Sequence, residues 1–120
     1  MRSIRLYMLF FLLLGVFGCS EKDPQELLKR GVRAARSGEW EKALELSNES
    51  LQNAEAYTKA RILKGICLQE LRRPEEARQT LKEAANASKD SFAAQFFYGW
   101  VLCENSEYGK ALTPLERAHE

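Results

Sequence analysis

A fixed 34-residue interval most limits what this 120-residue chain can fold into. Three glycines and three alanines recur at this interval. They are Gly31, Gly65 and Gly99, and Ala43, Ala77 and Ala111. Each glycine precedes its alanine by the same distance along the chain, with a helix break between them that is followed by Trp40, Pro74 or Tyr108. A fixed period of roughly 20 to 50 residues is typical of stacked-repeat proteins. The chain is therefore predicted to fold as successive copies of one unit, each packed on its neighbours.

Composition is ordinary for a globular protein, with 45% hydrophobic and 29% charged residues. Apart from Arg2 and Arg5, which lie in the segment discussed next, 16 basic residues face 17 acidic ones. This near-neutral balance gives no electrostatic basis for binding nucleic acid. Three cysteines and one histidine are too few and too far apart for a disulfide framework or a zinc site, so no metal and no cofactor are predicted.

The first 18 residues have the organisation of an export signal. Arg2 and Arg5 precede an apolar run over 6–17, and small Gly18 comes directly before Cys19. Twelve helical residues span about 18 Å, short of the roughly 30 Å hydrocarbon core of a bilayer. Residues 1–18 are therefore predicted to be a cleaved signal peptide and not a permanent membrane span.

From residue 24 onward, apolar residues recur at helical spacing on both sides of each break, which predicts an all-α chain of helical hairpins. Asp23 is predicted to cap the first helix, with Pro24 at its first position. Pro74 suits the first turn of the fourth helix. Ser106 is predicted to be the N-cap of the last helix.

These residues resemble the tetratricopeptide repeat family. The family pattern has a small residue on helix A, a glycine followed by an aromatic residue at the turn, as in Gly38 and Trp40, and alanines early and late in helix B. The resemblance implies a short right-handed solenoid of three helix-turn-helix repeats, at about 24–57, 58–91 and 92–120. Ser47 and Ser50 depart from the pattern, which usually has a large apolar residue and an alanine there. The first repeat is accordingly predicted to be the loosest.

The resemblance also implies where a partner binds. In this family helix A lines a concave surface, chiefly through the residues three before and one after its small residue. In this sequence those positions hold Leu28, Val32, Ile62, Ile66, Phe96 and Trp100. Repeats that grip acidic peptide tails often carry Lys, Arg or Asn there, so these six apolar residues predict a groove for an apolar peptide or helix. The alternative is that the same stripe is buried in a homo-oligomer or by internal packing.

The exposed end of the third hairpin is a further place for contacts. No additional polar helix follows that hairpin, although repeat arrays generally need one. Leu102, Leu112 and Leu115 are therefore predicted to face a partner, a second subunit, or residues missing from this sequence.

The sequence around the cut site, Val16-Phe17-Gly18-Cys19, resembles the bacterial lipobox. The resemblance implies that Cys19 carries a lipid, that 19–23 is a short tether, and that the protein is anchored in the cell envelope. Ser20, in place of an aspartate, implies the periplasmic face of the outer membrane. The alternative is ordinary secretion, with Cys19 a bystander.

No catalytic constellation is recognisable, so the chain is not predicted to be an enzyme. Glu116 and His119 form a single Glu-x-x-His motif, whereas di-metal carboxylate sites need two such motifs and further glutamates. Cys67 and Cys103 lie on neighbouring predicted helices, either as free thiols or as a disulfide. The predicted function is that of a lipid-anchored adaptor or assembly factor of the bacterial envelope that holds an apolar segment of a partner. The alternative is a structural lipoprotein that self-associates.

Overall fold

The computed structural model describes residues 23–53 and 57–119. The predicted signal peptide, Cys19 and most of the tether lie outside the described residues. The described residues form six α-helices. They are α2 (Pro24–Arg36), α3 (Trp40–Asn53), α4 (Thr58–Glu70), α5 (Pro74–Ala87), α6 (Phe92–Glu104) and α7 (Tyr108–His119). Within this part of the chain, none of the helices combines the length and apolar character needed to span a bilayer.

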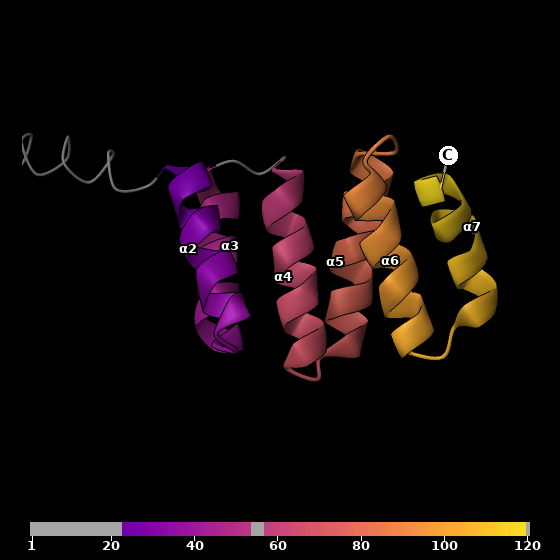
Figure 1. The fold of residues 1–120 in the computed structure, drawn as a ribbon, viewed down its shortest axis with the longest axis horizontal. Coiled ribbons are helices and arrows are strands. Elements are labelled where there is room, and N and C mark those ends of the chain that lie inside the picture. The colour runs from indigo at the N-terminus through magenta and orange to yellow at the C-terminus, as the bar shows by residue number, and fades with distance from the viewer. Residues whose placement is uncertain (1–22, 54–56, 120) are drawn as a thin grey trace, which may run out of the picture.

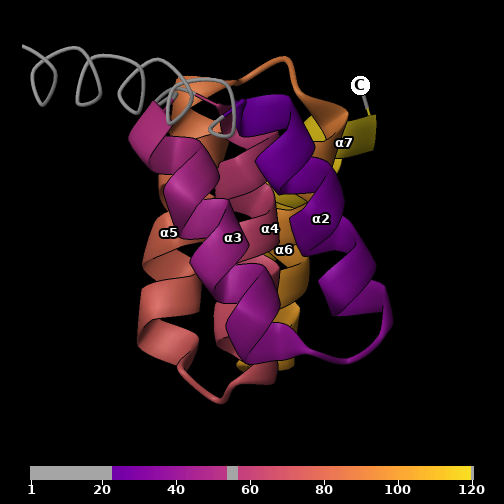
Figure 2. The same cartoon turned by 90° about the vertical axis from the view of Figure 1, so that its left-hand side faces the viewer.

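The helices pair into three hairpins, α2–α3, α4–α5 and α6–α7, which stand in a row along the long axis of the molecule (Figure 1). Successive hairpins touch through α3 and α4 and through α5 and α6. The first helices of the hairpins also meet directly, since α4 contacts both α2 and α6. Seen down the row, parts of the later hairpins are visible on either side of the first one, so the hairpins are offset from one another (Figure 2). The predicted all-α repeat solenoid is thus confirmed.

Glycines on the first helices let the two helices of a hairpin approach closely. A Cβ atom at Gly65 would lie 2.4 Å from the Leu81 Cγ atom on α5. In the third hairpin a Cβ atom at Gly99 would lie 2.5 Å from the Leu115 Cγ atom on α7. These distances are well below the contact distance of two carbon atoms, about 3.5 to 4.0 Å. The constant interval of the glycines therefore reflects one steric requirement, met by a leucine on the facing helix.

The first hairpin meets this requirement differently, because Ser47 stands where the other hairpins have leucine. A Cβ atom at Gly31 would instead lie 2.8 Å from the Leu63 Cδ2 atom, which belongs to the next hairpin. Both serines of α3 are fully buried, and each has a hydrogen bond. The Ser47 hydroxyl donates to the Leu44 carbonyl at 2.8 Å, and the Ser50 hydroxyl donates to the Pro24 carbonyl at 2.8 Å.

All three hairpin turns use one backbone geometry. The residue with a positive φ angle in each turn recurs at the same interval as the glycines of the first helices. These residues are Gly38 (φ 76°), Arg72 (φ 61°) and Ser106 (φ 63°). The next residue's N–H then donates to a carbonyl in the last turn of the preceding helix, at 2.9, 2.9 and 2.7 Å in the three turns. This arrangement is the Schellman motif, in which a residue in the left-handed conformation ends a helix.

The prediction that Ser106 is the N-cap of the last helix is wrong. Its N–H donates to the Cys103 carbonyl at 3.0 Å, so it closes α6 instead of opening α7. The helix α7 begins later, at Tyr108. By contrast, the predicted cap at Asp23 is confirmed, because its carboxylate accepts from the Gln25 N–H at 3.1 Å and Pro24 is the first helical residue. Pro74 likewise begins α5, as predicted.

Candidate functional site

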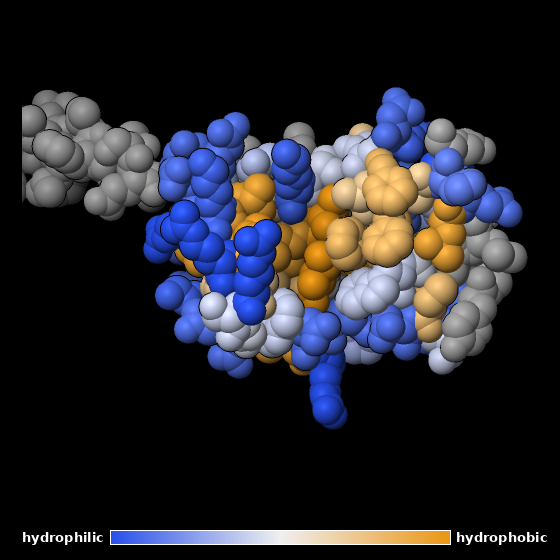
Figure 3. All heavy atoms as spheres, in the orientation of Figure 1, coloured by the Kyte–Doolittle hydropathy of each residue, from blue (hydrophilic) through white to orange (hydrophobic). Residues whose placement is uncertain are grey.

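The six residues predicted to line a groove all lie on the first helices of the hairpins, two each on α2, α4 and α6. We call the surface formed by these three helices the A-helix face. A band of hydrophobic residues crosses this face over α4 and α6, whereas strongly hydrophilic residues cover most of α2 (Figure 3). Leu28 and Val32 pack against a core cluster shared by the first hairpin and α4, and Ile66 and Trp100 pack against one shared by the second hairpin and α6.

The six positions are not equally accessible. Ile62 is only 7% exposed and is part of the core, so it offers little surface to a partner. Leu28, Val32, Ile66 and Trp100 are half-buried. Phe96 is 40% exposed, the largest accessibility among the six. The structure therefore concentrates the accessible apolar surface on α6, whereas the sequence predicted a groove lined by apolar residues of three helices.

An aromatic cluster on α6 dominates this surface. Phe92 and Phe96 are stacked with ring centroids 5.9 Å apart, and Phe97 meets Phe96 edge to face at 5.3 Å. Trp100 continues the series with a centroid 6.1 Å from that of Phe97. We call these four residues the α6 aromatic cluster. Phe92 is 63% exposed and was missed by the sequence analysis, because the family pattern assigns no contact role to its position.

Two of the three leucines predicted to face a partner from the third hairpin are used inside it. Leu102 is fully buried, and Leu115 packs on Gly99. For Leu102 that prediction was wrong, because the residue sits on the side of α6 that faces the core. The side chain of Leu112 lies outside the described residues. Phe92 and Phe96 form the exposed apolar surface of the third hairpin instead.

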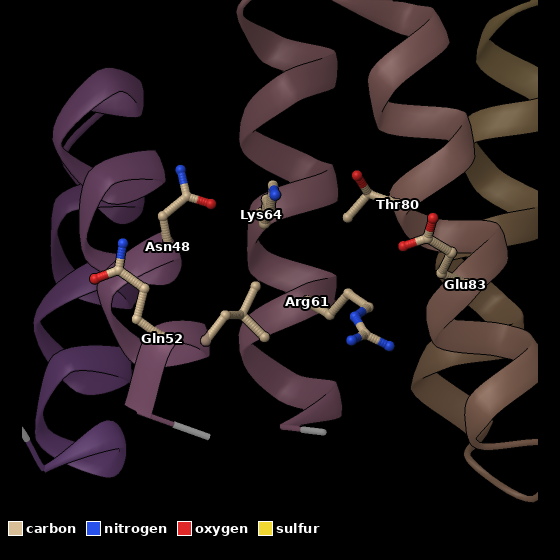
Figure 4. A pocket seen from close by; sticks show the side chains of 7 residues that line it. Asn48, Gln52, Arg61, Lys64, Thr80 and Glu83 are labelled. Atoms are coloured by element: carbon tan, nitrogen blue, oxygen red, sulfur yellow. The ribbon is translucent and has the colours of Figure 1, made fainter. Parts of the chain in front are cut away.

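A polar pocket of about 610 Å³ opens between α3, α4 and α5 (Figure 4). It is lined by Asn48, Leu51, Gln52, Arg61, Lys64, Thr80 and Glu83. Figure 4 shows Asn48 and Gln52 on one side of the pocket and Thr80 and Glu83 on the other, with the α4 cations between them. Glu83 accepts from the Gln79 Nε2 group at 3.1 Å. Because its lining carries both positive and negative charges, this pocket would bind polar groups, unlike the apolar A-helix face.

At the second junction of the stack, more deeply packed residues stand at two of the equivalent positions. Gln95 and Tyr98 occupy, one repeat later, the positions of Arg61 and Lys64. Gln95 is 1% exposed and donates from its Nε2 group to the Ala85 carbonyl at 2.8 Å, while Tyr98 packs against the core. The pocket was not predicted from the sequence, because it depends on how far apart two packed hairpins stand.

Two features of the described residues bear on chemistry, the grouping of metal-ligating side chains and the reactivity of the thiols. No group of three or more His, Cys, Asp or Glu among them could hold a metal ion. Cys67 and Cys103 are free thiols, the first buried and the second half-buried. Burial raises the pKa of the Cys67 thiol to about 11, which disfavours the reactive thiolate.

A family model described as tetratricopeptide repeat matches residues 34–96, slightly more than half of the chain. With the 34-residue period and the observed hairpins, this match shows that the chain belongs to the tetratricopeptide repeat family. A comparison with curated proteins finds no match.

Solved structures with the same fold include several tetratricopeptide domains. The Arabidopsis OM64 TPR domain is 18% identical with a TM-score of 0.74, over 81% of this chain and 80% of that one. The yeast Sti1 TPR2B domain in complex with pHsp70 is 19% identical with a TM-score of 0.74, over 79% and 76% of the two chains. The second TPR of Spaghetti (RPAP3), bound to the HSP90 peptide SRMEEVD, is 15% identical with a TM-score of 0.74, over 82% and 92%.

Proposed function

We propose that this protein is a lipid-anchored adaptor or assembly factor of the bacterial cell envelope. Its A-helix face binds an apolar peptide or helix of a partner protein. The observation that carries the proposal is the α6 aromatic cluster, in which Phe92 is 63% and Phe96 is 40% exposed. Monomeric proteins rarely expose large apolar side chains next to one another, and such patches usually mark interaction sites.

The tetratricopeptide fold supports the proposal, because it is a protein-interaction scaffold. Two proteins of similar structure are bound to chaperone-derived ligands, pHsp70 and the HSP90 peptide SRMEEVD. The latter peptide is rich in carboxylates, whereas the six predicted groove positions of this chain are all apolar. We therefore propose that this protein takes an apolar segment and not an acidic tail. Aromatic residues are also frequent anchors of protein interfaces.

Affinity capture tests the proposed binding. The full-length wild-type chain and a Phe96→Ala, Trp100→Ala variant are each used as bait on a detergent extract of the source cells, and captured proteins are identified by mass spectrometry. We expect the variant to recover a wild-type partner at least about 10-fold less well, since loss of two anchor residues typically costs more than about 1.4 kcal/mol. Circular dichroism controls for helix content. Equal recovery by a folded variant would contradict a role for the A-helix face.

Membrane anchoring rests on the lipobox resemblance of 16–19 and is tested separately. We expect Cys19→Ser to move the protein from the membrane fraction to the soluble or unprocessed fraction, because acyl chains on Cys19 supply the anchoring energy, about 0.8 kcal/mol per buried CH₂ group. Ser20→Ala is the matched control and should stay membrane-bound. Lipid labelling of the wild-type chain checks the modification itself. A Cys19→Ser protein that is still processed and still membrane-bound would refute lipidation as the anchor.

A further inference from the structure

The exposed side of α2 is strongly basic. Lys29, Arg30, Arg33 and Arg36 are all exposed, and Glu26 is the one acidic residue of the helix. At about 100° per residue, three of these cations lie within a sector of about 60° on the helix surface. The residues of α2 that are buried in the core are all uncharged. The positive charge is therefore concentrated on the exposed side of this helix, whose visible surface is strongly hydrophilic in Figure 3.

The arginines of α2 have no acidic partner among the described residues. Lys29 pairs with Glu26 at 3.5 Å, but none of the three arginines forms an ion pair with a carboxylate that the structure describes. By contrast, the exposed Arg73 is neutralised by Glu76 at 2.6 Å. Each of the other described helices contains at most one arginine. The guanidinium groups of α2 thus present uncompensated charge to whatever lies beside the helix.

The second helix of the same hairpin has the opposite charge. Glu41, Glu45 and Glu49 follow one another at intervals of four residues along one side of α3, and Lys42 is the one cation of that helix. Lys42 itself lies next to the carboxylate of Glu39. An anionic surface would therefore attract α2 and repel α3. Because the first hairpin is polarised in this way, such a surface can orient the hairpin as well as bind it.

The proposed lipid anchor would hold α2 close to a membrane. Four peptide units connect Cys19 with Asp23, the residue that caps α2, and they reach no farther than about 14 Å. The helix itself, with 13 residues, is about 20 Å long. Attraction between charges decays over about 8 Å at physiological ionic strength. A helix that lies along the membrane surface therefore brings all its cations into range, whereas an upright helix leaves Arg36 out of range.

We propose that the basic side of α2 docks on anionic phospholipid headgroups of the membrane that holds the lipid anchor. This inference rests on the proposed anchoring at Cys19 and adds an orientation to it. The planar guanidinium group matches phosphate oxygens with two parallel hydrogen bonds, and basic residues clustered beside a membrane are attracted to anionic lipids. The docking surface comprises Lys29, Arg30, Arg33 and Arg36. It shares no residue with the α6 aromatic cluster, so membrane docking and partner binding use different side chains.

The tether favours lipid over an acidic protein as the occupant of this surface. Because the anchor keeps α2 next to the headgroups, docking is an intramolecular step with a high effective concentration of anionic lipid. An acidic segment of another protein would have to displace those headgroups at its own, lower concentration. Charge complementarity and the short tether together therefore select the membrane surface.

Fluorescence quenching at the membrane surface tests the proposal. The full-length chain, purified from membranes in mild detergent, carries a dye on Ser37→Cys at the end of α2 or on Glu45→Cys on α3, both in a Cys103→Ser background. It is reconstituted into phosphatidylcholine vesicles with or without phosphatidylglycerol, and a nitroxide on the lipid headgroup is the quencher. We expect phosphatidylglycerol to increase quenching at least about 2-fold more at residue 37 than at residue 45, and high salt to abolish the increase.

Charge variants identify the groups responsible. Arg33→Gln with Arg36→Gln should lower the ratio of docked to undocked chain about 25-fold, because each cation near an anionic surface contributes a factor of about 5. Lys82→Gln with Lys89→Gln is the matched control, since it removes the same charge from exposed sites outside α2 and should leave docking unchanged. Circular dichroism confirms the helix content of each variant. Quenching that does not depend on phosphatidylglycerol, or that falls equally in both double variants, would overturn the proposal.

The outcomes separate this inference from the proposed function. If lipid labelling shows acyl chains on Cys19 but anionic lipid has no effect on quenching, the anchor stands and the inference is wrong. If labelling fails while the dye on residue 37 still responds to phosphatidylglycerol through Arg33 and Arg36, the anchor is refuted and α2 remains a lipid-binding surface. If the α2 variant loses a protein partner in affinity capture and no dye responds to anionic lipid, α2 binds an acidic protein and the inference is wrong.

Discussion

The three hairpin turns show how single residues carry backbone strain. Gly38, Arg72 and Ser106 occupy one left-handed conformation, but only the first lacks a Cβ atom. For an L-residue with a side chain this conformation costs about 1 to 2 kcal/mol. No atom lies within 4 Å of a Cβ atom built on Gly38, so glycine is needed there for its φ angle and not for space. Two of the three turns are therefore held in a conformation that their own residues disfavour.

Glycine at the strained turns should stabilise the protein. We expect Arg72→Gly and Ser106→Gly each to raise the free energy of unfolding by about 1 kcal/mol, and Gly38→Ala to lower it by a similar amount. Urea denaturation followed by circular dichroism measures all three. Arg73→Gly, one residue along at φ −115°, is the control and should not stabilise. An unchanged midpoint for both glycine variants would show that these turns are not strained.

The buried thiol predicts a difference in reactivity. Because burial raises the pKa of Cys67 to about 11 from its ordinary value of 9.0, its thiolate fraction at about pH 8 should be about 100-fold lower than that of a free thiol. We expect iodoacetamide to modify half-buried Cys103 before Cys67, as read by peptide mass mapping. Denaturant should remove the difference. Fast labelling of Cys67 in the folded protein would contradict its burial.

The same pKa shift has a consequence for stability. The Cys67 pKa is higher in the folded state than in the unfolded chain, so folding favours the neutral thiol. This contribution is fully present below about pH 9 and is lost as the pH rises toward about 11. Cys67→Ala should therefore weaken the fall in stability over this alkaline range, compared with wild type in the same denaturant titration. An identical fall in both proteins would assign it to other groups.

At the scale of the helix, a hairpin depends on one glycine and one leucine that fit each other. Because Gly65 has no side chain, Leu81 can pack directly against it. A Cβ atom at Gly65 would lie only 2.4 Å from the Leu81 Cγ atom. Leu81 is fully buried, so it cannot swing into solvent to make room. The pair therefore sets the distance between α4 and α5 in the middle hairpin, which has a neighbour on each side.

Enlarging the glycine should force these helices apart. We expect Gly65→Ala to lower the free energy of unfolding by about 1 to 3 kcal/mol and Gly65→Leu by more, through overpacking. Leu81→Ala alone should cost about 2 to 5 kcal/mol because it leaves a cavity. Since the two sites touch, the double variant Gly65→Ala, Leu81→Ala should lose less than the sum of the single losses. Strict additivity in thermal or urea unfolding would argue against this steric pairing.

The whole molecule is a row of units that contact their neighbours. Stability in such a stack is approximately the sum of unit and junction terms, so damage should spread according to position. The middle hairpin takes part in both junctions, whereas the third takes part in one of those described. A steric clash at Gly65 should therefore destabilise more of the molecule than an equal clash at Gly99.

Hydrogen exchange can measure that reach. We expect Gly99→Ala to raise exchange rates in α6 and α7 while α2 to α4 keep most of their protection, because only one junction is weakened. Gly65→Ala should raise exchange in all three hairpins. Mass spectrometry of peptic fragments reports each helix separately. Uniform loss of protection in both variants would mean that the described repeats unfold as one cooperative unit.

The sequence by itself determined the repeat architecture, because its physical cause is local. Close helix packing needs a small residue at one place in each unit, so Gly31, Gly65 and Gly99 disclose the period and the hairpins without coordinates. The N-cap at Asp23 and the first helical position of Pro24 and Pro74 were also predictable, since they depend on adjacent residues alone. The turn at Ser106 was predicted wrongly because serine suits an N-cap, although its position two repeats after Gly38 indicates a helix-closing residue.

Only the tertiary structure decided which apolar residues remain accessible. Ile62 and Phe96 occupy the same position in their repeats, yet α6 buries the first while the second stays open. Whether a residue on one of these helices is buried depends on the neighbouring helix. The type of the residue itself does not reveal this. For that reason the sequence predicted an apolar face over three helices, whereas the structure places its accessible part on α6.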